Sequence, residues 1–147
     1  MKKLIIAAIG LLLCAGAFAQ ETECIGKEMD GSLTLRVWGK GRNRTDALEQ
    51  AKKQAVYDVL FNGITKGNTD YNMRPVMTEV NARQRYQDYF DIFFMDRGEY
   101  LKYISMEDKR AGSTRVTNRN YRDVTVGVTV RVLVPQLRAR LKADGLL

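Results

Sequence analysis

Two stretches of the chain alternate hydrophobic and polar residues with the period of two that is typical of a half-buried β-strand. The first is Leu33–Val37, and the second is Tyr121–Val134, in which every second residue from Val124 onward is valine. Weaker strand patterns cover residues 100–106 and 114–116, on either side of a predicted turn at 110–113. We expect these segments to form an antiparallel sheet of three to four strands.

The clearest helical pattern runs from Asp46 to Phe61. Its apolar residues recur at steps of three and four, and three alanines spaced by four would let the helix lie close against a sheet. Thr45 is the expected N-cap, and Gly63 is the expected C-terminal stop.

Residues 78–95 also have a helical pattern, with a break predicted near Asp88, and follow a polar connection over 68–75. This segment holds most of the phenylalanines. The sequence leaves open whether the aromatic residues at 86–94 lie in the core or on the surface. A short helix with inward-facing leucines is predicted from Pro135 to Gly145, because proline suits a first helical position and glycine a C-terminal stop.

These elements predict an α+β fold. One long helix packs on the antiparallel sheet of three to four strands. An additional aromatic helical segment and a short C-terminal helix complete the domain.

The first nineteen residues have the three parts of a secretory signal peptide. Lys2 and Lys3 form the positive region, Leu4–Leu13 the apolar region and Ala17–Ala19 the cleavage site. The apolar run is much shorter than the roughly twenty residues that cross a bilayer. We therefore predict an exported protein that works in the periplasm or at the outer membrane, with secretion from the cell as an alternative.

The predicted mature chain begins with a flexible polar tether over residues 20–31, followed by a single domain over 32–147. Cys24 is the only cysteine left after cleavage, so it cannot form an internal disulfide. Two interpretations stay open: an unpaired thiol in the tether, or a bond between two chains. An alternative to cleavage before Gln20 is lipidation of Cys14, although Leu13 is not the small residue that usually precedes a lipidated cysteine.

Positive charge is the main electrostatic feature, because removal of Lys2 and Lys3 lowers the formal charge only from +7 to +5. Outside the cytoplasm this favours acidic lipids, glycans or acidic proteins as partners over nucleic acid, and permits peripheral membrane attachment. The basic residues gather around the predicted hairpin, with one tyrosine: Arg110, Arg115, Arg119, Arg122 and Tyr121. We predict an anionic-ligand or partner surface there, with a solvated hairpin tip as the alternative.

The residue types present exclude several chemistries. The chain has no histidine, which excludes Ser-His-Asp and Cys-His catalysis, histidine zinc sites and haem ligation by histidine. A single mature cysteine excludes thiolate zinc sites and CxxC redox chemistry. We therefore expect no metal, no cofactor and no enzymatic activity.

Two motifs suggest alternative functions. Asp88 and Asp91 share a helix face, and two carboxylates about 5 to 10 Å apart are what a glycosidase needs. The neighbouring aromatic residues could instead bind carbohydrate, or pack in a core whose solvated face holds the acids. Gly39-Lys40-Gly41 precedes a helix and could present N–H groups to a phosphate, or form a plain strand-to-helix turn.

A strand with a glycine-rich end (Val37–Gly41) leads into an alanine-rich helix (Ala47–Leu60), and the valine strand (Val124–Val134) leads into a short leucine helix that ends at Gly145. This order resembles the strand–helix–strand–strand modules of Gram-negative envelope proteins. Examples are the N-terminal domain of the flagellar assembly protein T and related small outer-membrane lipoproteins.

The resemblance covers Leu33–Phe61 and Tyr121–Leu147, and the aromatic insert from Tyr71 to Tyr100 is not part of it. It implies an α+β fold and an assembly or interaction role in the envelope, and it carries no functional residues.

The leading hypothesis is an exported, non-enzymatic cell-envelope protein that works through contacts with other proteins or with itself. The long valine strand could pair with another chain if it lies at a sheet edge. The alternative is a ligand-binding module that contacts an anionic glycan or lipid through the basic hairpin.

Overall fold

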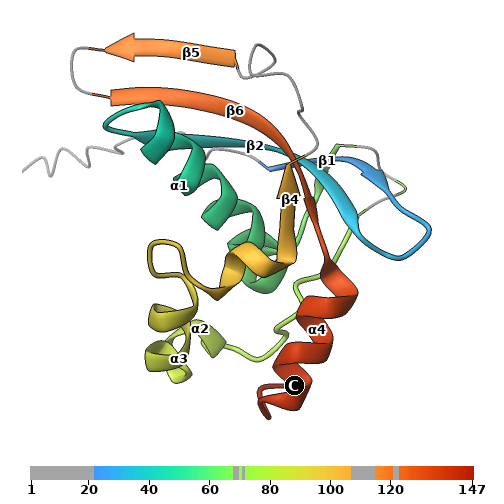
Figure 1. Cartoon of the computed structure of the whole chain (residues 1–147). Helices are drawn as coiled ribbons and strands as arrows, with labels where there is room; N and C mark the ends of the chain where they lie inside the picture. The colour runs from blue at the N-terminus through green and yellow to red at the C-terminus, as the bar shows by residue number, and fades with distance from the viewer. Residues whose placement is uncertain (1–21, 68–69, 71, 107–114, 121–122) are drawn as a thin grey trace, which may run out of the picture.

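The computed structural model describes residues 22–67, 70, 72–106, 115–120 and 123–147, and it confirms the α+β class. One long helix lies across one face of a curved sheet (Figure 1). The strands are β1 (Glu23–Lys27), β2 (Leu33–Gly41), β3 (Lys66–Gly67), β4 (Ile104–Met106), β5 (Arg115–Asn120) and β6 (Asp123–Val132). The helices are α1 (Arg44–Tyr57), α2 (Ala82–Arg85), α3 (Gln87–Phe93) and α4 (Val134–Ala143), with a π-helical turn at Asp58–Asn62 and a 3₁₀ helix at Glu99–Tyr103.

The strand order is β3-β1-β2-β6-β4, and β5 also pairs with β6. Every pair is antiparallel except β1 with β3, so the sheet is mixed rather than purely antiparallel. The long β6 has β2 on one side, and on the other it has both β4 and β5. β6 therefore does not lie at a sheet edge, which was the condition for its pairing with another chain, because two short strands share its second side.

The tether predicted over residues 20–31 is wrong for Glu23–Lys27, which form β1 against β2. Backbone hydrogen bonds hold this strand, and they leave no trace in the side-chain pattern. Cys24 is only 2% exposed, and burial raises the pKa of its thiol. A buried, protonated thiol cannot reach a second chain, which argues against an intermolecular disulfide. Cys14 and the predicted leader lie outside the described residues.

Helix α1 packs directly on β2, since its spaced alanines Ala47, Ala51 and Ala55 are fully buried. A Cβ at Gly39 would lie 2.0 Å from the backbone oxygen of Ala47, so only glycine permits this approach. The N-cap is Asn43 rather than the predicted Thr45, because Asn43 Oδ1 accepts a hydrogen bond from the Asp46 N–H at 2.9 Å.

The aromatic segment contains two short helices, α2 and α3, which meet at Tyr86, two residues before Asp88, so the break predicted near Asp88 is confirmed. Within the 86–94 segment Phe90 and Phe93 are buried in the core, and Tyr86, Tyr89 and Phe94 are partly buried and pack against it. Ring contacts join it to the end of α1 and to the 3₁₀ helix, with Phe61–Phe90 at 4.9 Å and Phe93–Tyr103 at 6.0 Å between centroids. The 3₁₀ helix replaces the first half of the strand predicted over 100–106.

The last part of the chain follows the prediction closely. The valines of β6 from Val126 to Val132 are buried, and α4 begins with Pro135 in its first turn. Leu137 and Leu141 face the core as expected. Within the described residues, no helix has both the length and the apolarity to cross a membrane.

Candidate functional site

The predicted basic hairpin is described only in part. Arg115 and Arg119 lie on β5, where Arg115 pairs with Gly127 and Arg119 with Val124 of β6, and the register shifts between them. Arg110, Tyr121 and Arg122 lie outside the described residues. The structure thus places two of the five predicted residues, both of them on β5.

The glycine-rich end of β2 has no space for a phosphate. A Cβ at Gly41 would lie 2.4 Å from the Ala47 nitrogen, which shows how closely α1 covers this strand. Two nearby N–H donors are also occupied: Asp46 Oδ2 accepts from the Arg42 N–H at 2.9 Å, and Asn43 Oδ1 accepts from the Asp46 N–H. The phosphate-binding alternative is wrong, and this segment is a strand-to-helix turn.

The carboxylates Asp88 and Asp91 do not form a catalytic pair. Both are exposed, and Arg83 holds Asp91 in an ion pair. The hydrogen bond from Arg83 lowers the pKa of Asp91, whereas a general acid needs a raised pKa. In the described part of the chain, no group of three or more acidic or cysteine residues is placed to hold a metal ion.

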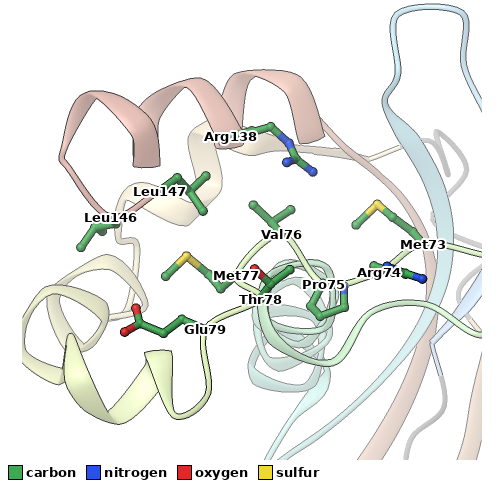
Figure 2. A pocket seen from close by; sticks show the side chains of 10 residues that line it. All are labelled: Met73, Arg74, Pro75, Val76, Met77, Thr78, Glu79, Arg138, Leu146 and Leu147. Carbon is green, nitrogen blue, oxygen red and sulfur yellow. The ribbon is translucent and has the colours of Figure 1, made fainter.

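A concave surface of the described residues lies elsewhere, between residues 73–79 and the end of α4. This open groove has a volume of about 600 Å³ (Figure 2). Its lining residues are Met73, Arg74, Pro75, Val76, Met77, Thr78, Glu79, Arg138, Leu146 and Leu147. Sequence reasoning missed it, because residues 68–75 read as a plain connection and the groove forms only when two distant segments meet.

Backbone hydrogen bonds fix the first wall of the groove to the π-helical turn that follows α1. The N–H groups of Val76 and Met77 donate to Val59 and Leu60, at 3.0 and 2.8 Å. Met73 exchanges two further bonds with Ile64. This geometry requires Gly63, which has a φ of 74° and whose missing Cβ would lie 2.6 Å from the Met73 oxygen.

The second wall is the end of α4. Gly145, at a φ of 74°, reverses the chain, and the Leu146 N–H donates to the Leu141 oxygen at 2.9 Å, which is a Schellman motif. This turn brings Leu146 and Leu147 to the groove, as Figure 2 shows.

A polar contact fixes α4 to α3. The Tyr89 hydroxyl donates to Asp144 Oδ2 at 2.6 Å, and Arg140 Nε donates to the same carboxylate at 2.6 Å. Burial and this carboxylate raise the pKa of Tyr89 to about 12, and the two donors lower the pKa of Asp144. Both walls of the groove are therefore held by the fold rather than by a ligand.

The groove has an apolar floor and an uncompensated positive charge. Val76 and Met77 are buried at its base. Glu79 is neutralised, because it pairs with Arg85 and accepts from the Tyr86 hydroxyl at 3.5 Å. Arg74 and Arg138 are exposed, and neither has a hydrogen-bond or ion-pair partner among the described residues.

The groove residues support binding rather than reaction. The polar side chains that line it are two arginines, one threonine and a glutamate already paired with Arg85. An apolar floor with a few polar groups at its rim is the usual make-up of a ligand or peptide site.

No protein-family profile, curated protein or solved structure matches this chain. The groove therefore has to be interpreted from its own chemistry.

Proposed function

We propose that this protein is an exported, non-enzymatic cell-envelope module that binds another envelope protein through the groove between residues 73–79 and α4. The observation that carries the proposal is a preformed groove that combines a buried apolar floor with two arginines that pair with no described residue. A fold gains little from charges left without partners beside apolar surface, whereas a binding site uses both.

The envelope setting rests on the sequence. The leader at residues 1–19 predicts export, and the β2–α1 and β6–α4 segments resemble assembly modules such as the N-terminal domain of the flagellar assembly protein T. The partner is accordingly a periplasmic or outer-membrane protein, with self-association as a special case.

Photo-crosslinking in living cells tests the interaction. We would place p-benzoylphenylalanine at Thr78, which is exposed and lines the groove, and at Gln50, which is exposed on α1, as a matched control. The expected result is a discrete crosslinked product from position 78 and none from position 50. Equal labelling from both positions, or none from either, would contradict a partner at the groove.

Intact-mass measurement of separated soluble and membrane fractions tests the export prediction. A soluble species that begins at Gln20 supports cleavage of the leader. A membrane species that begins at acylated Cys14 supports an anchored lipoprotein instead. A species that retains residues 1–19 in the cytoplasm contradicts export.

The second candidate is a module that binds an anionic glycan or lipid through the basic hairpin. One observation favours it: the only tryptophan, Trp38, is half-buried and covers Gly127, which pairs with Arg115 of the hairpin. Tryptophan is enriched at interfaces where one end of its ring system is apolar and the other is in contact with water.

Trp38 also reports on this candidate directly. Vesicles containing phosphatidylglycerol should change its fluorescence, and added salt should reverse the change because exposed charges are screened. An unchanged emission spectrum with vesicles and with acidic glycans would eliminate the second candidate without affecting the groove.

A further inference from the structure

We propose that the groove binds an extended peptide segment of the partner in which apolar side chains stand beside aspartate or glutamate. This inference rests on the proposed function and specifies the chemistry of the partner. Three properties of the groove carry it: its charge, its free backbone donors and its preformed walls.

The charge of the groove selects an acidic partner. Arg138 projects from α4 and Arg74 from the opposite segment, so guanidinium groups border the apolar floor from both walls (Figure 2). Guanidinium groups bind carboxylates with two parallel hydrogen bonds. Glu79 is already paired with Arg85, so the described lining of the groove has no acidic side chain left for these arginines, and a partner would supply it.

The backbone of the first wall favours a peptide over an acyl chain. In the described residues, nothing accepts a hydrogen bond from the N–H groups of Thr78 and Glu79, and both residues are exposed. A peptide in the groove can supply a carbonyl oxygen to such a donor. An acyl chain has no such groups, and an open groove would leave much of it in water.

The floor suits an apolar side chain from that peptide. Met73, Met77 and Leu146 line it, and methionine adapts its shape to different apolar partners. Backbone bonds to Val59 and Leu60 hold the first wall, and the Tyr89–Asp144 contact holds the second. Little ordering is then needed when the peptide binds, which lowers the cost of binding.

Selection from a phage-displayed library of random dodecapeptides against the full mature chain tests the inference. We expect the selected sequences to combine Asp or Glu with Leu, Ile, Met or Phe. A synthetic peptide from this selection should bind about 30-fold more weakly to the Arg74→Glu, Arg138→Glu variant, because two charged contacts become repulsive.

The matched control is Arg42→Glu with Arg97→Glu, which changes the net charge equally at exposed positions outside the groove. This control should bind the peptide within about twofold of the wild type, because distant exposed charges are screened. A peptide with Lys in place of its acidic residues should bind the groove variant better than the wild type. Those three results together support the inference.

Other outcomes overturn it. The acidic partner would be eliminated if the selected peptides contained no acidic residues. It would also be eliminated if the groove variant and the control lost peptide affinity equally. The proposed function stands without this inference in two cases. In the first, Leu147→Asp weakens the binding of selected peptides that lack acidic residues. In the second, p-benzoylphenylalanine at position 78 still crosslinks in cells. If the selection yields no peptide, and vesicle binding depends on Arg74 and Arg138, the groove is an anionic lipid site instead. No crosslink at Thr78 removes the proposed function itself.

Discussion

The contact of α1 with the sheet and the groove beside α4 are both lined by apolar side chains. They differ in whether their charged side chains have hydrogen-bond partners within the described fold. In the first region, the buried carboxylate of Asp58 accepts hydrogen bonds from Gln54 at 2.8 Å, from Asn62 at 2.6 Å and from Thr22. In the groove, Arg74 and Arg138 lie beside apolar surface and no described residue pairs with them.

This difference distinguishes residues that stabilise the fold from residues that are available to bind a partner. A buried charge must be satisfied inside the fold, because leaving it unpaired costs several kcal/mol (on the order of 3). An exposed arginine costs the fold almost nothing and stays available to a partner. Mutations in the closed region should therefore reduce stability, and mutations of the groove arginines should reduce binding alone.

The largest expected effect is in the aromatic part of the core. Phe90→Ala removes a fully buried ring that contacts Phe61 at 4.9 Å, and should lower the free energy of unfolding by about 4 kcal/mol. Ile92→Ala, at a position 65% exposed on the same helix, should change it by less than about 0.5 kcal/mol. Urea unfolding measures both. Equal values would mean that α3 does not pack as described.

The contact between α1 and β2 should be nearly as sensitive. Gly39→Ala places a Cβ against the backbone of Ala47 and Ala51, neither of which can move without shifting the helix. We expect a loss of about 3 kcal/mol in urea unfolding. Gly26→Ala is the matched control, since a Cβ there meets nothing within 4 Å. A harmless Gly39→Ala would show that α1 lies farther from the sheet.

The contact that holds the second wall of the groove should show a pH dependence. The folded pKa of Tyr89 is about 12, above its ordinary value of 10.0, so folding favours the protonated phenol. Its contribution is full below pH 10 and is lost as the pH rises from about 10 to about 12. Tyr89→Phe should cost about 1 kcal/mol at neutral pH and reduce the alkaline loss of stability. Urea unfolding of the wild type and of Tyr89→Phe at pH 8 and pH 11 measures this. An equal loss of unfolding free energy between the two pH values in the two proteins would refute it.

The smallest expected effect on stability is at the groove arginines. Arg74→Glu with Arg138→Glu should change the free energy of unfolding by less than about 0.5 kcal/mol, because both side chains are exposed and neither pairs with a described residue. Thermal and urea unfolding are the measurements. A loss above about 1.5 kcal/mol would mean that the arginines are structural, and would remove the basis of the groove proposal.

Local sequence patterns were sufficient to predict a secondary-structure element where the burial of each residue follows from the periodicity of its own segment. The alternation from Val124 to Val132 predicted β6, and the spaced alanines predicted the buried face of α1. Patterns failed where the backbone alone decides the structure. Strand β1 follows no side-chain periodicity, and Asn43 replaced Thr45 as the cap because the helix begins one residue before Thr45.

The sequence by itself determined the α+β class, the main helix and the two long strands, and the lack of histidine chemistry. Only the tertiary structure decided that β6 is interior, that Phe90 and Phe93 are buried, and that residues 73–79 meet the end of α4. The physical reason is that periodicity records how each segment faces water and core. It carries no information on which distant segment supplies the other wall of a groove.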